Sequence, residues 1–273
     1  MAGDFYIRFW GVRGSIPCPG QGTLRFGGNT SCVEVRAGDR LLILDAGSGL
    51  LGLGDSLQAD GPIEAELLLS HLHYDHILGL PFFAPAYDGR NSLRIWAGDC
   101  QGGIEAALQK YLQPPFFPVP LKRMSARIRF EDFSAGDTLS PGDAVQIRTT
   151  ALNHPDGATA YRIEYDGRSV CYVTDTEHPE QGLDANILQL IRGANIVIYD
   201  ATYNDQDYPA HRGWGHSTWE SGLALCEQAG VRSLVVFHHA PERTDAQLQQ
   251  LDDELQRRRP GSVVAREGQI LRP

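Results

Sequence analysis

Short apolar runs separated by Gly- and Pro-rich turns recur along the 273-residue chain and predict a fold rich in strands. Residues 5–10 alternate between apolar and polar side chains, as a strand with one buried face does. Further apolar runs predict strands over residues 32–35, 41–44, 67–69, 93–96, 127–130, 144–152, 161–165, 169–174, 195–199 and 233–237. Helical patterns predict helices over residues 49–58, 103–112, 183–191, 217–229 and 244–258, with Ser48 and Ser217 as expected caps.

The stretch QPPFFPVPL, residues 113–121, interrupts this alternation. Its prolines remove backbone donors and fix φ, so it is neither a regular helix nor a central strand. We expect a rigid apolar loop, which either packs over the core or forms a wall of a binding site.

One apolar run, residues 67–69, leads into HLHYDH, which places three histidines and an aspartate within six positions. Alternate residues of a strand share a face, so His71 and His73 can reach one metal ion together. Asp75 and His76 follow where the strand ends and point elsewhere. The sequence therefore predicts two adjacent metal ions, one for each half of the motif.

Other predicted strands also end in polar residues that can bind metals. The residues that follow the strands are His71, Asn153 with His154, Asp175, Asp200 and His238. We expect these strand ends to converge on one rim of a rigid scaffold, where the side chains act together.

Charge and cysteine content limit the partners and the compartment. The chain has 24 Lys and Arg against 34 Asp and Glu, a formal charge of −10, which disfavours a long nucleic acid but allows a small charged substrate at a cation centre. Five cysteines without CxxC spacing fit no simple disulfide framework, so we expect them reduced. No run of about 18 apolar residues occurs, and we expect a cytoplasmic protein without a membrane span.

HLHYDH with the later His154, Asp175 and His238 resembles the metallo-β-lactamase superfamily, and the resemblance covers nearly the whole chain. It implies an α/β fold, the αββα sandwich, in which two mixed β-sheets pack face to face with helices outside. It also implies a single hydrolase domain over residues 1–273.

The resemblance further implies two divalent metal ions, with zinc as the first expectation and manganese as the alternative. One ion would be held by His71, His73 and His154, and the other by Asp75, His76 and His238. Asp175 would bridge the two ions, where classical β-lactamases have a cysteine, which argues against antibiotic hydrolysis. His239 competes with His238 for the last ligand position. Asp45 resembles an early structural aspartate that accepts a hydrogen bond from a ligand histidine, although a plain turn residue is the alternative.

Gly215 to Thr218, GHST, resembles the element of ribonuclease Z and related phosphodiesterases whose histidine faces the scissile phosphate. His216 and Asp200 would carry that role here, with Asp75 beside them among the catalytic residues. The segments RFWGVRGSIP, FGGNTSC, LPFF, PPFFPVPL and FHHAPERTD look like a bacterial branch of cyclic-phosphate phosphodiesterases. The resemblance thus implies hydrolysis of a small cyclic phosphodiester, such as a cyclic nucleotide, by a hydroxide that bridges the two metals.

Three other functions remain open from the sequence. They are transfer-RNA 3′ processing as in ribonuclease Z, thioester hydrolysis as in glyoxalase II, and metal-dependent binding without turnover. The partners that we expect are a small phosphodiester substrate and a second copy in a homodimer. Ser15 and Asn29 are candidates for substrate contact, whereas His178, His211 and Trp214 are interpreted first as loop residues.

Overall fold

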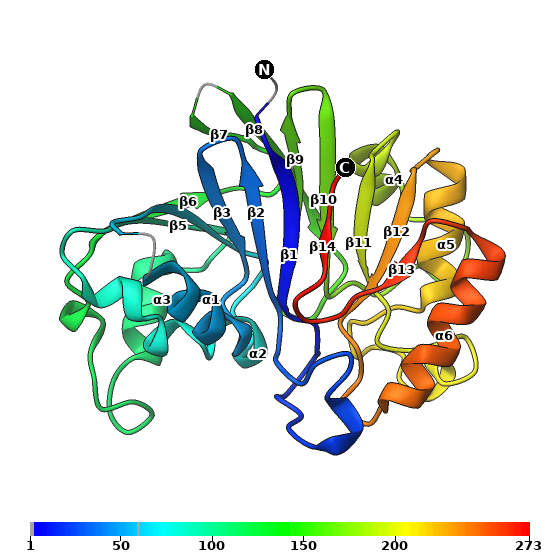
Figure 1. Cartoon of the computed structure of the whole chain (residues 1–273), viewed down its shortest axis with the longest axis horizontal. Helices are drawn as coiled ribbons and strands as arrows, with labels where there is room; N and C mark the ends of the chain where they lie inside the picture. The colour runs from blue at the N-terminus through cyan, green and yellow to red at the C-terminus, as the bar shows by residue number, and fades with distance from the viewer. Residues whose placement is uncertain (1–2, 59–60, 143) are drawn as a thin grey trace.

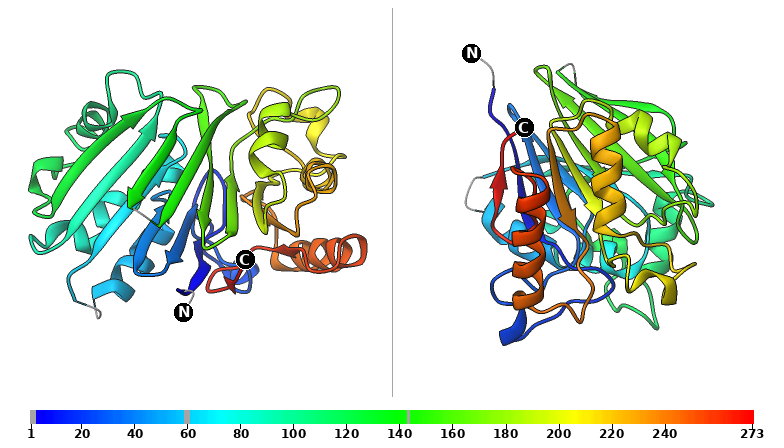
Figure 2. Two further views of the ribbon diagram at one scale, coloured as in Figure 1. Left: turned by 90° about the horizontal axis from the view of Figure 1, so that it is seen from above. Right: turned by 90° about the vertical axis from the view of Figure 1, so that its right-hand side faces the viewer.

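The computed structural model describes residues 3–58, 61–142 and 144–273, and within these ranges the strands form two seven-stranded sheets. The sheets pack face to face, and the longer helices cover their outer faces (Figure 1, Figure 2). This arrangement confirms the αββα sandwich and the α/β class that the resemblance to the superfamily implies.

The first sheet has the order β14-β1-β2-β3-β4-β5-β6. Its strands are β1 (Phe5–Gly11), β2 (Cys32–Ala37), β3 (Arg40–Leu44), β4 (Glu64–Leu69), β5 (Ser92–Gly98), β6 (Arg127–Phe133) and β14 (Ile270–Leu271). The predicted strands at residues 32–35 and 41–44 form the antiparallel hairpin of β2 and β3, with Val35 opposite Leu42. Strands β3 to β6 are parallel, so their carboxyl ends lie at one edge.

The second sheet has the order β13-β12-β11-β10-β9-β8-β7. Its strands are β7 (Thr138–Gly142), β8 (Val145–Leu152), β9 (Ala158–Tyr165), β10 (Arg168–Val173), β11 (Ile196–Asp200), β12 (Ser233–Phe237) and β13 (Val263–Val264). Strands β10 to β13 are parallel, whereas β7 to β10 pair in antiparallel fashion. The sheet is therefore mixed, as is the first.

The helices are α1 (Gly49–Leu57), α2 (Tyr74–Ile77), α3 (Ile104–Tyr111), α4 (Ala185–Ile191), α5 (Trp219–Gln228) and α6 (Asp245–Arg258). Short 3₁₀ turns occur at η1 (Gln21–Thr23), η3 (Leu80–Phe82), η4 (Ala84–Tyr87), η5 (Leu121–Arg123) and η6 (Tyr208–Ala210). Helices α1 and α3 pack on the first sheet, and α4, α5 and α6 pack on the second (Figure 1). None of the helices in the described ranges combines the length and apolar character needed to cross a bilayer.

Neither expected residue caps its helix with a side-chain hydrogen bond, although Ser48 does occupy the N-cap position of α1. The Thr218 side chain, not that of Ser217, caps α5 by accepting from the Ser221 amide. Ser48 precedes α1 but its hydroxyl makes no capping bond, because it accepts from the Thr30 amide instead. In both cases a tertiary hydrogen bond takes the hydroxyl away from the adjacent helix.

The 113–121 loop is exposed at Phe116 and packs over the core at the following residue, Phe117. Phe117 packs against the apolar cluster between the first sheet and its helices, and its ring centroid lies 5.8 Å from that of Phe82. Phe116 is 72% exposed. The loop thus packs over the core in part, and its Gln113, Pro120 and Leu121 also line a groove beside α3.

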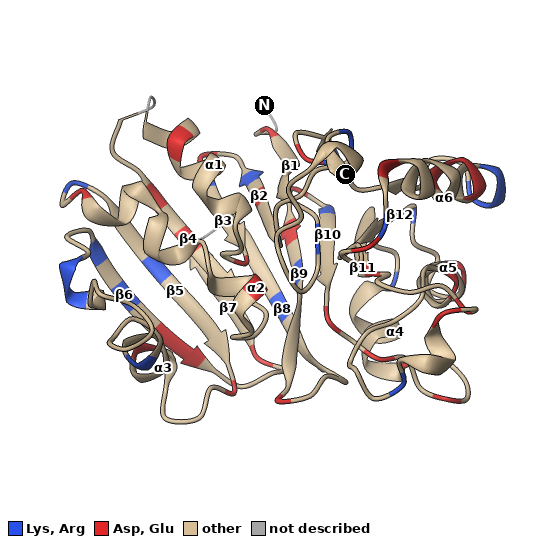
Figure 3. Cartoon of the chain, turned by 90° about the horizontal axis from the view of Figure 1, so that it is seen from below, with Lys and Arg blue, Asp and Glu red and all other residues tan. Residues whose placement is uncertain are grey.

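Large side chains fill the space between the sheets, among them Phe5, Phe9, Tyr161, Tyr172 and Phe237, each fully buried. Burial of such a side chain contributes about 1.5–3 kcal/mol, so the two sheets form a stiff frame. The carboxyl ends of the parallel strands of both sheets meet at one edge of this frame, where α2 lies. Figure 3 looks onto that edge from below, with α2 near its middle.

Candidate active site

Strand ends from both sheets deliver polar side chains to this edge. Asp45 follows β3 and Ser70 follows β4, while Asp200 ends β11 and His238 follows β12. The backbone turns sharply at Asp45, Asp175 and His238, which have φ of 60°, 54° and 60°. A left-handed conformation costs roughly 1–2 kcal/mol for a residue with a side chain. These three left-handed residues all lie at strand ends on the rim, where the turn of the backbone directs their side chains toward the candidate site.

The first group of candidate ligands consists of His71, His73 and His154. One ring nitrogen of each lies within 4.8 Å of the others, and Nε2 of His154 is 3.1 Å from Nδ1 of His73. Nε2 of His71 is buried and has no hydrogen-bond partner among the described residues. An unpaired buried nitrogen costs about 1–3 kcal/mol, unless a bound group satisfies it.

The second group consists of Asp75, His76 and His238, which come from α2 and from the end of β12. Nε2 of His76 and Nε2 of His238 lie 3.3 Å apart, and Oδ2 of Asp75 is 3.2 and 3.3 Å from them. All three side chains are buried. The three inward atoms therefore face one small volume.

Asp175 lies between the two groups. Its Oδ1 is 3.3 Å from Nε2 of His76 and 3.2 Å from Nε2 of His238. Its Oδ2 faces the other group, 3.7 Å from Nε2 of His71 and 3.9 Å from Nε2 of His154. One carboxylate oxygen thus points toward each group, which is the arrangement that a bridging ligand needs.

The outward nitrogen of each of these five histidines has a polar neighbour. The contacts join His71 to Ser70, His73 to Asp156, His76 to Asp45, His154 to the Gly215 carbonyl, and His238 to Thr202, over 2.7–3.5 Å. Such contacts fix the ring orientation and leave the inward nitrogen free to bind a metal. The contact between Asp45 and His76 is the one predicted for that aspartate.

The electrostatics of the two groups suit divalent cations. Burial lowers the pKa of His71 and of His154, which keeps the lone pairs of their rings available. Burial acts against ionised Asp175, but the neighbouring rings of His238, His76 and His71 hold its pKa well below the usual range. Imidazole nitrogens and carboxylate oxygens together form the donor set that zinc and similar ions take. The residues therefore fit two adjacent divalent ions.

His216 lies beside the second group and is held by Asp200. Its Nδ1 is 3.0 Å from Oδ2 of Asp200, and its ring stacks on His238 with centroids 5.0 Å apart. Asp200 is fully buried, and its two oxygens also accept from the amides of Thr202 and Thr176. Ligand atoms of Asp200 and His216 also lie within 4.8 Å of those of Asp175 and His238, but the two amides occupy both oxygens of Asp200, so we interpret it as the residue that orients His216.

The charge of His216 follows from these neighbours. Burial alone would lower the pKa of His216, but Asp200, Asp175 and Asp75 together raise it to about 9. Asp200 therefore favours the protonated form of the ring, and Nε2 is the nitrogen that a substrate can meet.

His238 and His239 have different surroundings, although they are adjacent in the sequence. The His239 ring is fully buried and its Nε2 donates to the Ala265 carbonyl at 2.9 Å. Burial lowers the pKa of His239 to about 3, so the ring stays neutral inside the core. The structure brings His238, and not His239, to the candidate metal groups.

A cavity of about 410 Å³ opens onto these groups. It is lined by Ser15, Leu72, His73, Tyr74, Asp75, Asp175 and His216. The Ser15 amide donates to Oδ2 of Asp75 at 2.7 Å, so this loop fixes a candidate ligand and borders the cavity. Asn29, the other candidate for substrate contact, instead bonds to Glu267 and Ser48. Its side chain serves the loop structure.

The remaining aromatic candidates lie outside the cavity lining. His178 contacts the Ser217 hydroxyl at 2.9 Å, and His211 stacks on Tyr203 with centroids 4.3 Å apart. Trp214 is 60% exposed beside His211. These contacts agree with their interpretation as loop residues.

Sequence reasoning missed several residues that hold the candidate ligands, among them Ser70, Asp156, Thr202 and Glu177. The first three contact ligand rings directly, and Glu177 accepts from backbone amides near His216. Ser70 and Thr202 each adjoin a predicted strand end, which is the signal that could have indicated them.

Comparison with known proteins gives concordant results. Residues 40–239 match the family model described as the β-lactamase superfamily domain. Ribonuclease Z of Haloarcula marismortui is 23% identical over 96% of this chain and 94% of its own length. The metallo-β-lactamase fold protein YhfI from Bacillus subtilis superposes with a TM-score of 0.75 at 21% identity, covering 98% of this chain and 99% of YhfI. A diphosphatase of the PhnP family gives a TM-score of 0.72 at 16% identity, with 98% of both chains covered.

Proposed function

Because this chain belongs to the β-lactamase superfamily, as the match over residues 40–239 shows, we propose that it is a dinuclear-metal phosphodiesterase that hydrolyses a small cyclic phosphodiester. The family and the donor set make it a metal-dependent hydrolase. The phosphate specificity and the cyclic substrate are the proposed part.

The observation that carries the proposal is the pair of His216 and Asp200 beside the metal groups. His216 lines the cavity, is held through Nδ1 by Asp200 at 3.0 Å, and has its pKa raised to about 9. A protonated imidazole at this place suits a reaction that develops negative charge on phosphate and leaving-group oxygens. The GHST segment that carries His216 supports the same class of reaction.

Two ions would be held by the residues described above. His71, His73 and His154 would hold one ion, and Asp75, His76 and His238 the other, with Asp175 between them. When bound, such a pair of divalent ions supplies a water of lowered pKa as nucleophile and neutralises phosphate oxygens. Zinc is the first choice for this donor set, and manganese is the alternative.

The chain's own residues then act on the substrate. His216 donates a proton from Nε2 to the leaving oxygen as its bond to phosphorus breaks, and Asp200 keeps Nδ1 protonated and stabilises the charged ring. Water adds to phosphorus, so a cyclic diester opens to a monoester with a free hydroxyl. The Ser15 amide holds Asp75 in place during this step.

The size and lining of the cavity support a small substrate. About 410 Å³ lies within the range of small-molecule sites. Of the described residues that line it, none is Lys or Arg, and the whole chain has a formal charge of −10. Since nucleic-acid affinity depends on cationic contacts with many phosphates, a single diester is the better match.

Transfer-RNA 3′ processing is the second candidate. It is favoured by the similarity to ribonuclease Z of Haloarcula marismortui, which extends over 94% of that protein. It would require phosphate contacts away from the cavity, and its products would be RNA fragments.

The test is metal analysis of the purified protein followed by assays with zinc or manganese. We expect two ions per chain and turnover of bis-p-nitrophenyl phosphate and of a cyclic nucleotide, with no cleavage of a transfer-RNA precursor. Cleavage of the precursor with no turnover of the cyclic nucleotide would establish the second candidate instead. Absence of turnover of every diester, with both ions bound, would refute a phosphodiesterase.

A further inference from the structure

Glu177 makes a dense set of hydrogen bonds to the loop that precedes His216. Its Oε1 accepts from the Tyr208 hydroxyl at 2.9 Å and from the Gly213 amide at 2.9 Å. Its Oε2 accepts from the Gly213 amide at 2.8 Å and from the Gly215 amide at 3.1 Å. The carboxylate therefore fixes both the start and the end of the loop 208–215.

The backbone of Glu177 is tied to a third segment. Its amide donates to the Asn153 carbonyl at 2.7 Å, and the Asn153 side chain donates back to the Glu177 carbonyl at 3.0 Å. Asn153 directly precedes the candidate ligand His154. Glu177 thus joins the segment that ends in His154 to the loop that ends at His216.

Gly215 is the point where the two segments meet. Its carbonyl accepts from Nδ1 of His154 at 2.8 Å, and this bond turns Nε2 of His154 toward the first metal group. Gly215 has a φ of 83°, and a Cβ added there would lie 2.2 Å from Nδ1 of His154. The close approach requires glycine, and the Gly215 amide, on the other side of its Cα, is held by Glu177.

We propose that Glu177 is a positioning residue that sets His154 and His216 relative to each other through Gly215. The inference rests on the proposed roles of His154 as a metal ligand and of His216 as the proton donor. A metal ligand and an acid that come from separate segments must be held in register for the leaving oxygen to meet the acid. Glu177 hydrogen-bonds to neither side chain and acts through the backbone of Gly215.

Glu177→Gln tests this, because the amide nitrogen cannot accept the hydrogen bonds that one carboxylate oxygen accepts. We expect the affinity for one of two Zn²⁺ ions to fall about 10- to 100-fold and kcat to fall by a similar factor, with KM unchanged. Zn²⁺ affinity is measured by competition with a chromophoric chelator, without any substrate. Trypsin cleavage after Arg212 reports whether the loop has loosened.

Glu180→Gln is the matched control, because Glu180 contacts the same loop through Arg212 at 3.4 Å on the exposed surface. It should leave Zn²⁺ affinity and kcat unchanged. Tyr208→Phe removes one bond to Glu177 and should shift both quantities in the same direction as Glu177→Gln, but less. This variant keeps the inference testable if Glu177→Gln does not fold.

Equal losses in the Glu177 and Glu180 variants would overturn the inference, as would normal Zn²⁺ affinity and kcat in Glu177→Gln. Zn²⁺ binding is measured without substrate. If the protein hydrolyses no diester, the proposed function is refuted, but the Zn²⁺ affinities of the variants still test the role of Glu177.

Discussion

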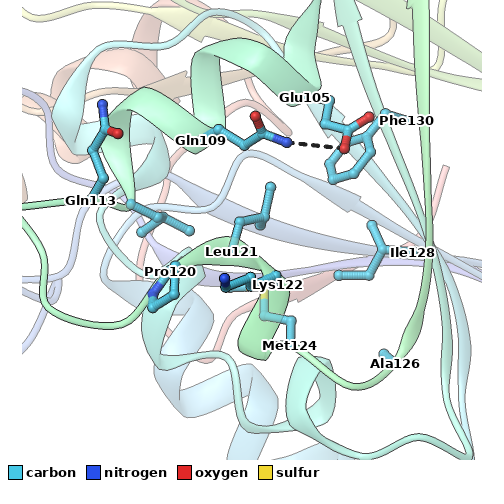
Figure 4. A pocket seen from close by; sticks show the side chains of 11 residues that line it. Glu105, Gln109, Gln113, Pro120, Leu121, Lys122, Met124, Ala126, Ile128 and Phe130 are labelled. Carbon is cyan, nitrogen blue, oxygen red and sulfur yellow. Dashed lines mark hydrogen bonds between the residues drawn. The ribbon is translucent and has the colours of Figure 1, made fainter.

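The cavity at the metal groups and the groove between α3 and β6 differ in the side chains that line them. The groove is the larger of the two, about 550 Å³, and Figure 4 shows its lining. Leu112, Leu121 and Met124 form its buried apolar side. Two of its polar residues bond to each other, since Gln109 donates to Glu105 at 3.1 Å (Figure 4). The smaller cavity opens onto histidines and carboxylates whose outward atoms have partners and whose inward atoms converge.

This difference shows that convergence of polar atoms, and not volume, marks the chemical site. Buried polar atoms without partners and left-handed residues both cost free energy, of order 1–3 kcal/mol each. Both features occur close together at the edge of the sandwich: Nε2 of His71 has no hydrogen-bond partner among the described residues, and Asp175 and His238 have a positive φ. The groove has ordinary side-chain packing. Substitutions should therefore separate the two regions by their effects on metal binding and activity.

Asp175→Ala should have the largest effect. Its carboxylate is the group that faces both sets of ligands, so its loss should release at least one metal ion and lower kcat/KM by at least about 1,000-fold. Metal content by elemental analysis and diester hydrolysis measure the two effects. Asp166→Ala is the control, because Asp166 also has a positive φ, 50°, but lies at the hairpin between β9 and β10. Retention of two ions by Asp175→Ala would contradict the bridging role.

His216→Ala should lower kcat by roughly 100- to 10,000-fold, the usual contribution of a general acid, with both ions retained. His211→Ala is the control from the same loop, since its ring stacks on Tyr203 and lies outside the cavity lining. Loss of a metal ion from His216→Ala would mean that this histidine is a ligand and that the site has been assigned wrongly.

Asp200→Asn should change the pH dependence of kcat. Asp200 raises the pKa of His216, which reaches about 9, against the effect of burial. Without that carboxylate the pKa of His216 falls, so the ring loses its proton at a lower pH. The decline of kcat on the alkaline side of the profile should therefore begin at a lower pH. We expect kcat at pH 8 to fall about tenfold, as for other residues that orient a catalytic group. If kcat of the variant declines at the same alkaline pH as kcat of the unsubstituted protein, the decline reports the titration of a group other than His216.

Local signals in the sequence predicted most strands and the polar residues that the structure brings to the rim, whereas the two-sheet fold followed from the resemblance to the superfamily. An apolar strand followed by His or Asp is visible in one short window, and HLHYDH is contiguous. Partners that are distant in the chain were not predictable, because no local pattern pairs them: Tyr172 donates to Asp45 across 127 positions. The same reason explains the Ser217 cap, since Tyr199 and His178 take its hydroxyl and leave Thr218 to cap α5.

Leu121→Ala should have the smallest effect on activity and a clear effect on stability. Leu121 is 8% exposed, lines the groove and packs in the cluster beneath α3. Its truncation should cost about 2 kcal/mol, the lower end for a buried leucine, because the open groove lets neighbours relax. Distant sites act independently, so kcat and metal content should change less than about twofold. Urea denaturation and the diester assay measure these quantities, with Leu121→Met as the control that keeps the volume. A tenfold loss of kcat in the folded variant would show that the groove is coupled to the metal groups, and the contrast between the two regions would then fail.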